Sequence, residues 1–133
     1  MAISKWQADL VLDAACTYIM TSTILFVVED GLSTPPTYTE MSATHDLATV
    51  VVTAGTGNGD FLIDDGAVNG REVNVLEQAA ITVDTSGTAL GVCLAISGTT
   101  LPVFVTTCTS QALVAANTVT VPAWTITFAD VTA

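Results

Sequence analysis

The densest group of chemically capable side chains is the carboxylate set Asp60, Asp64 and Asp65. Carboxylate oxygens bind calcium, and paired carboxylates also carry out glycoside hydrolysis. The spacing does not match an EF-hand loop, and an Asp-Gly pair such as Asp65-Gly66 is common in turns. A sugar cleft is usually lined with aromatic rings, which make up only 6% of this chain. The pattern therefore favours a turn, with an adventitious or interfacial cation site as the alternative.

A catalytic triad or dyad would have to use His45, because it is the only histidine of the chain. Asp46 follows it directly, and adjacent residues usually point apart. The sequence contains no Gly-x-Ser-x-Gly nucleophile elbow. His45 also lies in a polar stretch, which is typical of a solvated or turn-bonded histidine. We therefore predict no catalytic residue and no enzymatic activity.

Cysteines and glycines give no stronger sign of a cofactor or metal site. The three cysteines, Cys16, Cys93 and Cys108, form no Cys-x-x-Cys pair and stand far from His45 in sequence, so a zinc site is not expected. Cys93 lies in an apolar run and is predicted to be a core residue. The run from Gly55 to Gly59 lacks the lysine of a phosphate-binding loop. We predict a hairpin loop there, and no bound cofactor.

The charge balance excludes whole classes of partner. The chain has 133 residues, 2 basic and 13 acidic, for a net charge of -11. Nucleic acids and anionic membranes are bound through cationic patches, which Lys5 and Arg71 cannot build. The acidic surface favours solubility, with a basic or cation-bridged partner as the alternative. No apolar run approaches the ~20 residues of a membrane-spanning helix. The N-terminus also lacks signal-peptide features, so we expect a soluble protein made in the cytoplasm.

Charged residues make up only 11% of the sequence, well below the usual quarter. Alanine, valine and threonine are abundant instead, and a surface of such residues is easily buried. This composition favours a protein that hides part of its exterior in an oligomer or a larger assembly.

One amphipathic helix is predicted near the N-terminus, over about residues 4–20. Ser4 is a suitable N-cap. The apolar row that we expect to pack consists of residues at four-residue intervals, and the opposite face is polar. The packing row is Trp6, Leu10, Ala14 and Tyr18, and the polar face is Lys5, Asp9, Asp13 and Thr17.

The rest of the chain reads as about eight short strands separated by turns. Among the clearest are residues 23–29, 47–53, 71–76, 89–96 and 101–107, with the last two forming a hairpin and the first one central in its sheet. A long loop is predicted at about residues 30–46, where Pro35 and Pro36 disfavour regular structure, and a connector at residues 111–116. Trp124, Ile126 and Phe128 share one strand face, which predicts core packing.

These elements predict a single mainly β domain over residues 1–133. The expected fold is an antiparallel β-sandwich or barrel, jelly-roll-like, with one N-terminal helix.

Several segments together resemble small structural proteins encoded among the head and tail genes of tailed bacteriophages. They are residues 6–15 (WQADLVLDAA), 70–73 (GREV), 84–88 (DTSGT), 105–113 (VTTCTSQAL) and 117–124 (NTVTVPAW). The resemblance implies a virion component, and in particular a capsid decoration (cement) protein. Such proteins are generally β-rich and often trimeric.

The resemblance further implies a partner and a place. The partner would be the major capsid protein, bound on the outer surface of the capsid after synthesis in the host bacterial cytoplasm. The predicted contacts are the helix, through Trp6 and Leu10, and the long loop, through Tyr38 and Met41. The alternatives are a tail, collar or head-fibre component and a ligand- or glycan-binding β module.

Overall fold

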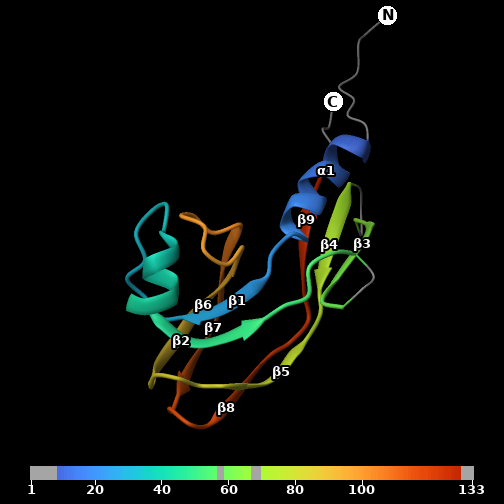
Figure 1. Cartoon of the computed structure of the whole chain (residues 1–133). Coiled ribbons are helices and arrows are strands. Elements are labelled where there is room, and N and C mark those ends of the chain that lie inside the picture. Colours follow the sequence, from blue (N-terminus) through green and yellow to red (C-terminus); the bar gives the residue numbers. More distant parts are fainter. Residues whose placement is uncertain (1–8, 57–58, 67–69, 130–133) are drawn as a thin grey trace, which may run out of the picture.

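The computed structural model describes residues 9–56, 59–66 and 70–129. This part of the chain is mainly β, with nine strands in three sheets, and every strand pair is antiparallel. The predicted fold class is thereby confirmed (Figure 1). The elements are α1 (Asp9–Ile19), β1 (Ile24–Val28), η1 (Glu40–Thr44), β2 (Asp46–Val51), β3 (Phe61–Asp65), β4 (Arg71–Val75), β5 (Gln78–Thr82), β6 (Gly87–Ala95), β7 (Phe104–Leu113), β8 (Thr118–Val121) and β9 (Trp124–Phe128).

The largest sheet has four strands in the order β2-β1-β6-β7. Strand β1 is apolar throughout and occupies an inner position, as its sequence predicted. Its partner β6 pairs with it in a continuous register from Ile24↔Ala95 to Val28↔Gly91. The predicted hairpin of β6 and β7 is also present. This sheet therefore has two outer strands, β2 and β7.

The two smaller sheets share one core with the inner face of the large sheet. Their strand orders are β3-β4-β9 and β5-β8. In β4 the alternation predicted from sequence is present, because Val73 and Val75 are buried while their neighbours are partly exposed. Ile126 of β9 is buried, and Trp124 and Phe128 pack against the same core. The prediction of core packing for this strand face is therefore confirmed.

Helix α1 confirms the predicted helix over its described residues, but with a different packing face. The side chains that enter the core are Leu12, Cys16, Ile19 and Met20. Leu10 and Tyr18, which we predicted to pack, are 78% and 61% exposed. Both faces carry apolar residues, so hydrophobic periodicity could not choose between them. Trp6 and Lys5 lie outside the described residues.

Two segment predictions also need correction. The predicted loop at 30–46 contains the short π-helix η1, and β2 begins inside it at Asp46. The predicted connector at 111–116 belongs in part to β7, because Ala112 and Leu113 continue the pairing with β6. Strand pairing thus overrode the weak local pattern at Asp46, which pairs with Val28, and at Ala112 and Leu113. In the described chain no helix has both the length and the hydropathy that crossing a bilayer requires.

Candidate partner-binding surfaces

An exposed apolar ridge runs along α1. We name Leu10, Val11, Ala14 and Tyr18 the α1 ridge; all four side chains are exposed, Val11 by 57%. They lie on the helix surface away from Leu12 and Cys16, which are buried. A contiguous set of large apolar side chains in water is typical of a surface that another molecule covers. The ridge therefore retains Leu10 as a candidate contact residue.

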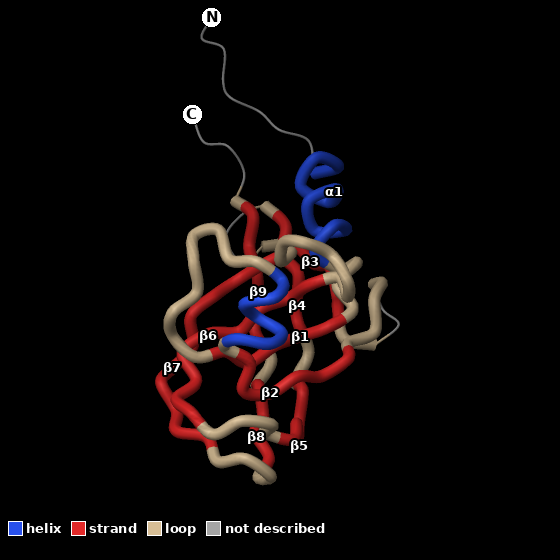
Figure 2. Tube along the Cα trace, turned by 60° about the vertical axis from the view of Figure 1, so that its left-hand side comes forward, coloured by secondary structure: helices blue, strands red, loops and turns tan. Residues whose placement is uncertain are grey.

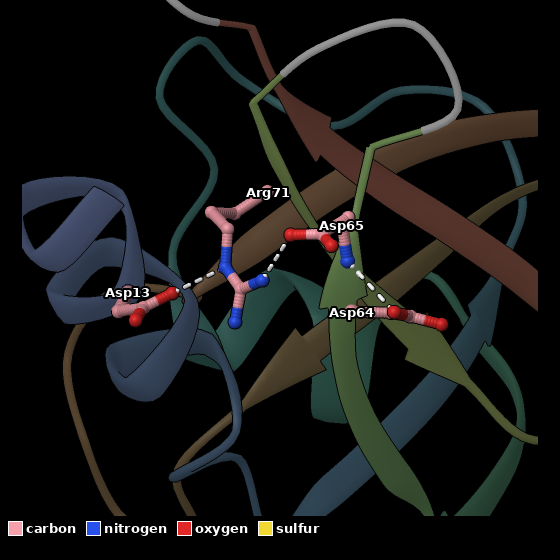
Figure 3. Close-up of polar contacts among 4 residues, drawn as sticks. All are labelled: Asp13, Asp64, Asp65 and Arg71. Carbon is pink, nitrogen blue, oxygen red and sulfur yellow. Dashed lines mark hydrogen bonds and ion pairs between the residues drawn. The ribbon is translucent and has the colours of Figure 1, made fainter. Parts of the chain in front are cut away.

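Arg71 of β4 fastens α1 to the sheet. Its Nε donates to Asp13 Oδ1 at 2.6 Å and its Nη1 donates to Asp65 Oδ1 at 2.5 Å (Figure 3). These hydrogen bonds, the one to Asp13 first, raise the pKa of the guanidinium above its usual range. Asp13 lies next to the buried Leu12, so this bridge lies on the side of α1 that packs against β4. The α1 ridge is consequently held in one orientation.

The three carboxylates singled out in the sequence have structural partners and do not converge. Asp65 Oδ1 accepts a hydrogen bond from Arg71 Nη1, and Asp64 Oδ1 accepts one from Asp65 N at 2.8 Å. Asp60 accepts from Thr53 N at 2.6 Å and from Gln78 Nε2 at 2.7 Å. Among residues 9–56, 59–66 and 70–129, no three His, Cys, Asp or Glu side chains are grouped to hold a metal ion.

Glu40 organises the segment between β1 and β2. Its Oε2 accepts hydrogen bonds from Ser33 Oγ at 2.6 Å and from Thr37 N at 2.8 Å. These bonds lower the pKa of Glu40 from 4.5 to about 2. The segment is therefore an ordered cover on the outer face of the large sheet.

The cover places Tyr38 and Met41 differently from our prediction. Met41 is completely buried beside Phe26 and Cys93. It leaves no side-chain surface for a partner in this conformation, and the predicted contact at Met41 is corrected on that ground. Tyr38 is half-buried, with its ring edge-on to Phe26 at 5.6 Å between centroids. Both residues hold the cover on the sheet through apolar packing.

His45 packs into the same region, so of the two environments that we expected, a solvated or a turn-bonded side chain, the solvated one is not observed. Its Nδ1 is buried and lies 3.7 Å from Glu29 Oε1. Gly31 has a φ of +105° and lies so close that an added Cβ would be 2.7 Å from His45 Cε1. A ring enclosed in this way by a glycine turn serves packing. The predicted core position of Cys93 is confirmed, and burial raises the pKa of its thiol to about 12.

The outer edge of β7 is a candidate surface that the sequence pattern did not predict. The other outer strand, β2, is covered by the chain itself: Leu47 O accepts a hydrogen bond from Asp84 N at 2.8 Å, and Ala48 forms a bridge with Val83. In the described chain β7 pairs with β6 alone. Its ten residues contain no charged residue and no proline, the devices that usually protect an edge. That absence was the signal available in the sequence.

Comparisons with protein-family models, with curated proteins and with solved structures gave no match for this chain.

Proposed function

We propose that the protein is a structural component of a tailed-phage virion. In this proposal it binds the outer surface of the capsid and stabilises contacts between major capsid subunits. The sequence resemblance supplies the class of protein. The structural observation that supports it best is the α1 ridge, where Leu10 and Tyr18 present large apolar side chains to solvent. A protein acting alone in water has no use for such a surface.

The proposed mechanism is mechanical. A decoration protein holds neighbouring capsid subunits by removing apolar surface from water, at roughly 25 cal/mol per Å² buried. This work needs a rigid ridge, which the ion pairs of Arg71 with Asp13 and Asp65 provide. It needs no proton transfer and no metal ion. In this proposal the protein is made in the host bacterial cytoplasm and located on the capsid surface.

Symmetry extends the proposal. Capsomers meet at three-fold positions, and a trimer presents three copies of one ridge to three equivalent partners. We therefore propose a homotrimer, with each ridge directed toward the capsid. Trp6 precedes Leu10 by four residues in sequence and belongs to the same proposed contact.

The proposal is tested on particles of the phage whose genome encodes the chain. Cryo-electron microscopy of purified particles is expected to show the protein on the outside of the head. A tail or collar position would assign it to the alternative virion component. If purified particles lack the protein, the virion proposal fails.

A variant pair tests the role of the ridge. Leu10→Ser with Tyr18→Ser removes apolar surface without touching the buried face of α1. We expect occupancy on particles to fall at least about tenfold, the scale of losing two interface anchors. Val114→Ser is the matched control, because Val114 is an apolar residue that is 57% exposed and follows β7 in the chain. Equal loss in the control would show that the ridge has no special role.

A further inference from the structure

The middle of β7 offers unpaired backbone groups to a partner. Val103 N donates to Leu94 O at 2.8 Å, so the backbone of Leu94 faces β7. From this point, residue pairs between β6 and β7 alternate between hydrogen-bonded and non-hydrogen-bonded. Val105 and Thr107 belong to the non-hydrogen-bonded pairs, so their N–H and C=O groups point away from β6. In the described chain the one hydrogen bond to these groups is a long contact of 3.5 Å from Thr106 Oγ1 to Thr107 O.

Two hollows flank this same stretch, one on each face of the sheet. The outer hollow, of about 520 Å³, has Val28, Gly91 and Val105 in its lining and reaches the turn after β1. The inner hollow, of about 280 Å³, is bordered by Val121 and Trp124 from the β8–β9 corner. Both hollows include residues Thr106, Thr107 and Cys108 of β7. Figure 2 shows β7 at the margin of the strands, in agreement with its place at the end of the sheet order.

We propose that the outer edge of β7 takes up an extended segment of another protein by β-strand addition. Main-chain hydrogen bonds to Val105 and Thr107 would hold the segment. Successive side chains of an added strand point to opposite faces, so they would enter the outer and inner hollows in turn. This inference rests on the proposed function, because it specifies how a capsid partner is gripped.

The charge around the outer hollow identifies the chemistry of that segment. Glu29 and Asp30 form part of its lining, and both side chains carry exposed surface. The described cation Arg71 lies elsewhere, engaged with Asp13 and Asp65. A lysine or arginine fits here, with its alkyl stem across the floor and its charge at the acidic rim.

The floor of the outer hollow is low because Gly91 has no side chain. A Cβ at this position would lie 3.1 Å from Thr106 O and 3.3 Å from Val28 Cγ2. The space above it accepts the stem of a long side chain. A second copy of this chain is the weaker occupant of this hollow, because each copy has only 2 basic residues to offer to the acidic rim.

Two synthetic peptides test the inference on the full-length protein. Both have eight residues and blocked ends; one alternates valine with lysine and the other alternates valine with glutamate. Calorimetry is expected to show that the lysine peptide binds at least about tenfold more tightly, with a preference that weakens in salt. Equal binding of the two peptides, or no binding of either, overturns the inference.

Variants of β7 connect the binding to the edge. Thr107→Pro removes an outward N–H and is expected to weaken the lysine peptide about tenfold, whereas the matched Thr107→Val keeps that N–H and the affinity. Val105→Lys leaves the backbone intact and places a positive charge in the outer hollow. It is therefore expected to lower the affinity for the lysine peptide about tenfold as well, and it tests the edge even if the proline variant misfolds. Glu29→Gln with Asp30→Asn should weaken binding about two- to fivefold. Unchanged affinity in Val105→Lys contradicts the inference.

Two further outcomes separate this inference from the proposed function. If particles bind the Val105→Lys variant as well as the parent protein, the β7 inference fails and the virion proposal stands. If the parent protein does not bind particles, the virion proposal fails, and the peptides still decide the role of the edge. Sedimentation could instead show that the parent protein is a dimer and that Thr107→Pro is not. In that case the occupant of the β7 edge would be a second copy of this chain and not a segment of another protein.

Discussion

Strands β2 and β7 are both outer strands of the same four-stranded sheet, but the described part of the chain covers β2 and leaves β7 open. At β2, the returning segment around Val83 and Asp84 bonds to Leu47 and Ala48. At β7, the backbone of Val105 and Thr107 faces solvent between two hollows. Among the described residues, a returning segment therefore protects the β2 edge, and no segment pairs with the β7 edge. An open edge of this kind is a site for another chain.

The comparison predicts a large difference in stability between the two edges. Leu47 of β2 is 1% exposed in the main core, and Leu47→Ala is expected to lower the free energy of unfolding by about 2–5 kcal/mol. Val105 of β7 is 37% exposed, and Val105→Ala is expected to cost about 1 kcal/mol or less. Urea denaturation measures both. Equal losses would mean that the β7 edge is covered as well as the β2 edge.

Hydrogen exchange sharpens the comparison at single amides. The amide protons of Val105 and Thr107 point outward, whereas those of Phe104 and Thr106 face β6. We expect the outward pair to exchange at least about a hundredfold faster in the free protein, because no sheet partner protects them. Residue-resolved NMR exchange provides the measurement. Slow exchange at Val105 and Thr107 would show that the edge is already paired in solution.

The start of β2 carries a smaller effect that depends on pH. Burial, and to a lesser degree the charge of Asp84, raises the pKa of Asp46 above 3.8. Folding then favours the protonated carboxyl, so the ionised group destabilises the protein above the folded pKa and this effect disappears as the pH falls below 3.8. Asp46→Asn should raise stability at pH 7 by about 1 kcal/mol or less, as measured by thermal unfolding. The gain should vanish near pH 3, and a gain that persists there contradicts this cause.

The smallest expected effect is local to the cover beside β2. The pKa of Glu40 is lowered to about 2, so its contribution is complete above pH 4.5 and is lost as the pH falls toward 2. Glu40→Gln should loosen the hydrogen bonds with Ser33 and Thr37 at neutral pH. NMR shifts of the Ser33 and Thr37 amides would follow the change, with Thr106 as a distant reference. Unaltered shifts at these two amides would show that Glu40 does not organise the cover.

Local sequence pattern determined most of the elements. An unbroken apolar run from Ile24 to Val28 requires burial on both faces, so it predicted an inner strand. Alternation around Val73 and Val75 predicted a half-buried strand in the same way. These predictions depend on neighbours in sequence, whose geometry is fixed by backbone period alone. The core role of Cys93 followed from its apolar flanks.

Tertiary structure decided the surfaces that matter for binding. Helix α1 has apolar residues on two faces. Burial of Leu12 and Cys16, together with the pairing of Asp13 with Arg71, 58 positions along the chain, leaves the opposite face outward. Met41 lies in a polar stretch but is buried, because it packs on the apolar outer face of the sheet beside Phe26 and Cys93. The open edge of β7 likewise depends on which strands become neighbours. Sequence period specifies which side chains share a face, whereas long-range pairing decides which face another molecule can reach.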